Sequence, residues 1–162
     1  MRRRLHVPQL LALTAICLGL AAAPNPATGT PERPDLKVRV ELQKEQRLGK
    51  WYVRMRFTVF NDGLALAGPS TLGTWWRANA GGPCPAVDGV YDLAPPVEAG
   101  ATQVVKLVTP PIPPGLSVFV LGPNTKKWPP GRYTITARAD FLSVIVETNE
   151  ANNQGSAAIS IP

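Results

Sequence analysis

The stretch Trp51-Tyr-Val-Arg-Met-Arg-Phe-Thr-Val-Phe-Asn-Asp-Gly63 decides the fold of this chain. Apolar side chains stand at every second position from Trp51 to Val59, and mostly polar or charged ones lie between them. A period of two residues predicts a β-strand with one buried face. The strand is expected to end at Asn61-Asp62-Gly63, because these residue types favour tight turns.

The same alternation recurs on both sides of this strand. No window outside the N-terminal segment has a convincing helical period, and the chain has 18 prolines, which interrupt helices. Seven or eight short strands joined by turns predict an all-β fold, an immunoglobulin-like β-sandwich of antiparallel strands. The other expected strands are 36–43, 72–78, 89–93, 101–109, 116–121, 132–140 and 157–161.

The first residues have the pattern of a secretory signal peptide. Arg2-Arg3-Arg4 is followed by an apolar run from Leu10 to Ala23, which ends in three small alanines. This run is shorter than the roughly 20 residues that a transmembrane anchor needs. We expect a signal peptide at 1–23, a disordered proline-rich linker at 24–34 and the β-sandwich domain at 35–162. The protein would then be exported to the periplasm, the cell surface or the medium.

The residue types left after this segment argue against catalysis. His6 is the only histidine, and Cys84 would be the only remaining cysteine. Ser-His-Asp and Cys-His sites, histidine-ligated zinc and an internal disulfide are therefore excluded from the mature chain. Loss of three arginines lowers the 17 basic residues to 14 against 11 acidic ones, a net charge of +3. Because these charges are dispersed, we expect no nucleic-acid partner. Because the mature chain would have no histidine, we also expect no enzyme activity, and we expect no cofactor.

A dense group of acids and amides stands near the end of the chain. In one interpretation these side chains bond backbone groups and fix a turn between the last two strands. In the other, Asp140, Glu147, Asn149 and Glu150 supply oxygen ligands to calcium. The structural interpretation is favoured, because no spaced calcium-loop motif is present. The whole group is Asp140, Glu147, Asn149, Glu150, Asn152 and Asn153.

With this group included, the chain resembles the bacterial cell-adhesion-related domain, CARDB. Five segments carry the resemblance, in the family's order, and the last is the most specific. They are Pro34-Asp35-Leu36-Lys37-Val38, the turn at Phe57–Gly63, Leu93-Ala94-Pro95 with Glu98-Ala99-Gly100, Pro130-Gly131-Arg132-Tyr133, and Asp140 with Glu147-Thr-Asn149-Glu150-Ala-Asn152-Asn153.

The resemblance implies a non-enzymatic interaction or adhesion module of the bacterial cell envelope. Its partner would be a protein or a cell-surface glycan. Two segments depart from the family pattern, a long proline-rich connection at 108–127 and the loop at 81–85. Because loops on a rigid scaffold often carry specificity, we expect the binding surface there.

The tryptophans and Cys84 leave alternatives open. Adjacent residues in a strand face opposite sides, so one of Trp75 and Trp76 is expected in the core and the other on the surface or beneath a loop. Trp128, beside two prolines, is expected to be the most exposed. Exposed rings would favour a small carbohydrate-binding or calcium-dependent ligand-binding module instead. Cys84 either forms an intermolecular disulfide, giving a dimer, or is a buried thiol.

Overall fold

The computed structural model describes residues 31–80, 84–85, 93–94, 101–102, 104–122 and 128–162. Residues 31–162 form one compact unit. The predicted signal peptide, most of the predicted linker and parts of the two divergent loops lie outside the described residues.

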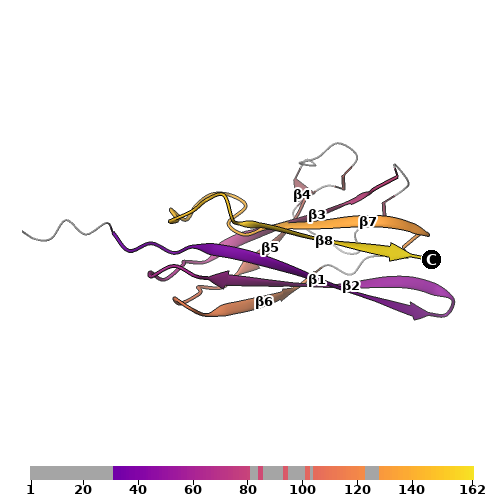
Figure 1. The fold of residues 1–162 in the computed structure, drawn as a ribbon, viewed down its shortest axis with the longest axis horizontal. Helices are drawn as coiled ribbons and strands as arrows, with labels where there is room; N and C mark the ends of the chain where they lie inside the picture. Colours follow the sequence, from indigo (N-terminus) through magenta and orange to yellow (C-terminus); the bar gives the residue numbers. More distant parts are fainter. Residues whose placement is uncertain (1–30, 81–83, 86–92, 95–100, 103, 123–127) are drawn as a thin grey trace, which may run out of the picture. The chain divides into compact units, whose positions relative to one another are not determined.

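The described residues form two antiparallel sheets (Figure 1). One sheet has three strands in the order β1-β2-β6, and the other has five in the order β4-β5-β3-β7-β8. No helix in this part of the chain is long and apolar enough to cross a membrane. The strands are β1 (Leu36–Arg47), β2 (Lys50–Asn61), β3 (Ser70–Ala78), β4 (Leu93–Ala94), β5 (Val104–Thr109), β6 (Ser117–Leu121), β7 (Gly131–Arg138) and β8 (Gln154–Ile161).

The alternating stretch forms β2, which pairs with β1 along its whole length, from Leu36 opposite Asn61 to Arg47 opposite Lys50. The predicted buried face is confirmed, since Val53, Met55, Phe57 and Val59 are at most 5% exposed. β2 ends at the expected turn, whereas β1 is four residues longer than expected because it stays paired with β2 as far as Arg47. The expected sandwich of antiparallel strands is therefore confirmed.

The core lies between the two sheets and is rich in aromatic rings. The ring of Trp128 contacts the ring of Tyr133 edge to face, with centroids 4.7 Å apart, and lies 6.2 Å from the ring of Trp76. Trp128 is only 2% exposed, so the expectation that it is the most exposed tryptophan is wrong. Flanking prolines favour a surface segment, but the Trp128 ring is buried because it packs against the rings of Trp76 and Tyr133.

Trp75 and Trp76 follow the expected alternation. Trp76 belongs to the core, whereas Trp75 lies on the other side of β3 beneath Phe141 of the β7–β8 connection, with ring centroids 6.4 Å apart. Both are nearly fully buried. Since Trp75, Trp76 and Trp128 are all covered, a sugar-binding platform of exposed tryptophans has no support from these three residues.

The described part of the proline-rich connection at 108–127 is held to the domain by packing and hydrogen bonds. Ile112 is 1% exposed, and its backbone forms two hydrogen bonds with Ala67. The buried Asn61 side chain donates to the carbonyl oxygens of Ala65 and Ile112 and accepts from the backbone N–H groups of Asp35 and Gly63. One side chain therefore joins the start of β1 to two connections.

Candidate interaction surface

A cationic and aromatic surface covers the side of the three-stranded sheet that faces away from the core. We call it the outer face. It is formed by alternate residues of three strands, which the pairing register places side by side. Its members are Lys37, Arg39, Glu41 and Gln43 of β1, Arg54, Arg56, Thr58 and Phe60 of β2, and Phe119 and Leu121 of β6.

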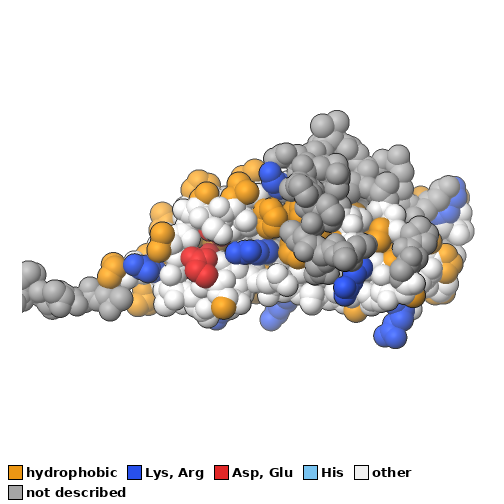
Figure 2. All heavy atoms as spheres, turned by 90° about the horizontal axis from the view of Figure 1, so that it is seen from above, with side chains coloured by type: hydrophobic (Ala, Val, Ile, Leu, Met, Phe, Trp, Pro, Cys, Tyr) orange, Lys and Arg blue, Asp and Glu red, His pale blue; other side chains and the backbone are white. Residues whose placement is uncertain are grey.

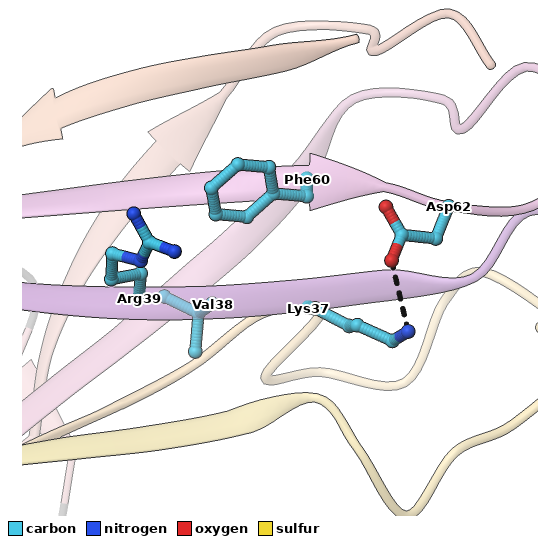
Figure 3. Close-up of a pocket in the computed structure, with 5 residues that line it drawn as sticks. All are labelled: Lys37, Val38, Arg39, Phe60 and Asp62. Carbon is cyan, nitrogen blue, oxygen red and sulfur yellow. Dashed lines mark hydrogen bonds and ion pairs between the residues drawn. The ribbon is translucent and has the colours of Figure 1, made fainter. Parts of the chain in front are cut away.

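Two arginines of the outer face lie over phenylalanine rings of the next strand. The Arg39 guanidinium is 5.6 Å from the centre of the Phe60 ring, and that of Arg56 is 4.5 Å from the centre of the Phe119 ring. Figure 3 shows Arg39 and Phe60 side by side on neighbouring strands. Such contacts are favourable because the ring face carries negative potential. Each stack also restricts a long, otherwise mobile arginine.

The stacked arginines differ from the other cations in their partners. Lys37 is 2.9 Å from a carboxylate oxygen of Asp62, as Figure 3 shows, and Arg54 is 3.6 Å from one of Glu45. Among the described residues, Arg39 and Arg56 form no ion pair with a carboxylate. Both guanidinium groups are thus stacked on a ring and available to an external anion.

The outer face contains two shallow hollows. One, of about 330 Å³, is lined by Lys37, Val38, Arg39, Phe60 and Asp62 (Figure 3). The other, of about 300 Å³, lies beside the second stack. Its lining is Glu41, Leu42, Gln43, Arg54, Arg56, Phe119 and Leu121.

Sequence reasoning missed this surface, because it assigned binding to the loops. The alternation that predicted the buried face of β2 also placed Arg54 and Arg56 together on the opposite face. That was the available signal. The stacks themselves depend on the register between three strands, and the pairing of β6 with β2 was not predicted.

The predicted acidic and amide residues lie together in and beside the β7–β8 connection, and we call them the terminal clasp. Asp140 has a positive φ of 42° and accepts hydrogen bonds from the backbone N–H groups of Val144 and Ile145, at 3.1 and 2.9 Å. Its carboxylate closes a turn, and Asp tolerates the left-handed conformation better than most residues.

Glu147 connects the clasp to the first strand. It is 4% exposed, and its carboxylate accepts hydrogen bonds from the Leu36 backbone N–H and the Asn153 side-chain amide. Burial raises the pKa of Glu147 to about 7, against the lowering effect of these two hydrogen bonds. The negative charges of Glu150 and Asp140 raise this pKa further.

The remaining clasp residues also form local hydrogen bonds. Asn149 accepts from the Ala151 N–H, Glu150 accepts from the Glu147 N–H, and the Asn152 amide donates to Asp35. The side-chain oxygens of Asn152 and Asn153 are buried and have no hydrogen-bond partner among the described residues. The described residues contain no group of three or more His, Cys, Asp or Glu side chains positioned to hold a metal. N–H donors engage the clasp carboxylates, which agrees with the favoured structural interpretation; calcium binding stays the alternative prediction.

The end of the domain that carries the clasp exposes aliphatic side chains. Leu64 and Leu66 of the β2–β3 connection, and Leu142, Val144 and Val146 of the β7–β8 connection, are each more than half exposed. In Figure 2 hydrophobic side chains gather at the left end, which is the end where β1 begins in Figure 1. These aliphatic side chains do not indicate the chemical class of a partner, whereas the outer face presents defined cations and rings. The outer face is therefore the better-defined candidate surface.

Cys84 is partly buried and packs against the core. Its thiol lies 3.9 Å from the Trp76 carbonyl oxygen, to which it donates a weak hydrogen bond. Residues 81–83 and 86–92 around it lie outside the described residues. Intermolecular disulfide formation therefore stays a prediction.

Comparisons with known proteins support the fold. No protein-family model and no curated protein matches the sequence. The chain is similar to the crystal structure of the CARDB domain of the PF1109 protein from Pyrococcus furiosus, in complex with di-metal ions, with 18% identity and a TM-score of 0.53 over 82% of this chain and 96% of that one. The solution structure of the same domain gives 22% identity and a TM-score of 0.51 over 80% and 96%. The described part of this chain is thus a CARDB-like domain in its fold.

Proposed function

We propose that the protein is an exported, non-enzymatic interaction module of the bacterial cell envelope, and that its outer face contacts the partner. One observation carries the choice of surface: Arg39 and Arg56 are stacked on Phe60 and Phe119 but form no ion pair in the described structure. The N-terminal signal pattern supports export, and the CARDB-like fold supports a β-sandwich module.

The outer face suits binding better than a flat apolar sheet would. A guanidinium group offers a planar fork of N–H donors, which pairs with carboxylate or phosphate oxygens. Stacking on a ring has already restricted the arginine, so less side-chain entropy is lost on binding. The outer face thus combines prepositioned cations with exposed apolar area, since Phe119 is 62% exposed.

The proposal that the protein is not an enzyme rests on its residue types. Its only histidine stands in the predicted signal peptide, and its one cysteine in the predicted domain is partly buried. The most perturbed carboxyl in the described structure, Glu147, lies inside the clasp and bonds the chain's own N–H groups. Its role is therefore proposed to be structural.

Attachment to isolated cell envelopes tests this function. Purified wild-type protein should sediment with envelopes from the producing cells, and the double variant Arg39→Gln/Arg56→Gln should remain in solution. Arg132→Gln removes an exposed arginine from β7 of the other sheet and should sediment like wild type. Equal attachment of all three proteins would refute the outer face as the contact surface.

Export is tested on the protein recovered from the producing cells. Its first residue should follow a cleavage site near Ala21 to Ala23, and it should be found outside the cytoplasm. Full-length protein confined to the cytoplasm would refute the export part of the proposal.

A further inference from the structure

We propose that the partner of the outer face is a carboxylated polysaccharide, with its carboxylates bound by Arg39 and Arg56 and its sugar rings against the neighbouring apolar surface. This inference rests on the proposed function, because it assumes that the outer face is the contact surface. It adds the chemical class of the partner, which the fold does not indicate.

The two arginines form a regular arrangement. Arg39 stands opposite Thr58, and Arg56 is two positions before Thr58 on the same strand, so the two arginines are diagonal neighbours. Their Cα atoms are therefore about 7–8 Å apart. Each side chain leans over the ring of the next strand in the same direction along the sheet, Arg39 from β1 to β2 and Arg56 from β2 to β6. The result is two parallel cationic stacks, which suit a ligand with repeated negative groups.

The location on a sheet face favours a polysaccharide over an extended peptide. Backbone N–H and C=O groups of a sheet lie in its plane and bond neighbouring strands, so the face offers side chains alone. An extended peptide that adds to a sheet gains most of its affinity from backbone bonds at an edge. A carboxylated polysaccharide needs no such bonds, because guanidinium groups take its carboxylates and apolar side chains contact its ring faces.

The charges around the stacks agree with an anionic partner and identify an internal control. Lys37 and Arg54 are ion-paired with Asp62 and Glu45, so the positive charge offered to a partner is mainly that of Arg39 and Arg56. Glu41 lies directly opposite Arg56. Glu41 forms no ion pair in the described structure. It lines the hollow beside the second stack, where it would repel a carboxylate. Replacing Glu41 by Gln should therefore strengthen binding, an effect opposite to that of the arginine variants.

Calorimetric titration of the purified protein with polygalacturonate tests the inference. Fully methyl-esterified polygalacturonate has the same backbone without the charge, and poly-L-glutamate carries carboxylates on a peptide. We expect binding to polygalacturonate alone, weakening as salt rises from 50 to 500 mM. Arg39→Gln and Arg56→Gln should each weaken binding about tenfold, as expected for loss of a charged hydrogen-bonding group. Glu41→Gln should strengthen it severalfold, and Arg132→Gln should not change it.

Each alternative result has a distinct meaning. Equal binding of the methyl ester, or equal affinities of wild type, Arg39→Gln and Arg56→Gln, would overturn the assigned carboxylate recognition. Binding to poly-L-glutamate instead would overturn the polysaccharide and indicate an acidic protein partner. If no polymer binds but the double variant still loses envelope attachment, the polysaccharide inference fails and the proposed function stands. If envelope attachment is also unaffected, the proposed function fails as well. Melting curves of every variant confirm that it is folded.

Discussion

Glu147 should make the domain less stable as the pH rises from 5 to 8. Its pKa is raised from 4.5 to about 7 in the folded protein, mainly by burial, whereas the unfolded chain has the ordinary value. Between these values the folded protein keeps a proton that the unfolded chain has released. Folding therefore takes up a proton, and the free energy of unfolding falls as the pH rises through this range.

The size of the effect follows from the two pKa values. Each pH unit between 4.5 and about 7 contributes about 1.4 kcal/mol, so the free energy of unfolding should fall by roughly 3 kcal/mol in total. For a domain of this size that corresponds to a decrease of roughly 10 °C in melting temperature. The fall should level off above about pH 8, where Glu147 is ionised in both states. The chain's one histidine, His6, lies outside the domain, so no histidine titration overlaps this range.

Urea unfolding at pH 5, 6, 7 and 8, followed by fluorescence of the buried tryptophans, measures this fall. Glu147→Gln removes the ionisation and should give a nearly flat profile. Glu150→Gln, a matched change at an exposed clasp residue, should keep most of the fall. A wild-type profile that is flat or rises over this range would refute the reasoning, as would a fall that survives in Glu147→Gln.

Three further predictions concern the same end of the domain. Gly63→Ala should destabilise the protein by about 2–3 kcal/mol in urea unfolding, because a Cβ at this position would overlap the backbone of Arg33 and Pro34. The control, Gly68→Ala, should leave the stability unchanged because the space around Gly68 is open. Equal effects of the two variants would contradict the close approach at Gly63. Asn61→Ala should cost about 3 kcal/mol, since it leaves the buried Ile112 carbonyl oxygen without the Asn61 donor; a loss below about 1 kcal/mol would argue against this network. The melting temperature should be the same in millimolar calcium as in the presence of a chelator, because N–H groups engage the clasp carboxylates. A calcium-dependent rise in melting temperature that disappears in Glu147→Gln would instead establish a calcium site.

The strands could be predicted from the sequence because they are a local pattern. The alternation in β1 and β2 reports which side of each strand faces the core, and the turn residues at Asn61-Asp62-Gly63 report where β2 ends. The clasp residues are also close in sequence, so their gathering was predictable. Their most consequential contact was not, because Glu147 bonds the backbone of Leu36, 111 positions earlier.

The outer face and Trp128 show the same limit. The stack of Arg56 on Phe119 requires β6 to pair with β2 in one register, which residues near either strand do not specify. For Trp128 the prediction from local sequence was wrong: the neighbouring prolines favour a surface loop, but the rings of Tyr133 and Trp76 pack against its ring. In both places long-range packing decides what local sequence leaves open.

The clasp also determines how the domain would respond to mechanical load. β1 starts at the clasp end of the domain, where the Pro34 carbonyl oxygen accepts a hydrogen bond from the Thr148 N–H. β8 runs beside β1 and ends at the opposite end of the domain (Figure 1). Tension between Pro34 and Ile161 would therefore run along both strands, across the hydrogen bonds that join β1 to β2 and β8 to β7 rather than in line with them. In that direction many bonds share the load at once, so a tethered partner would pull against the whole length of β1 instead of unzipping it.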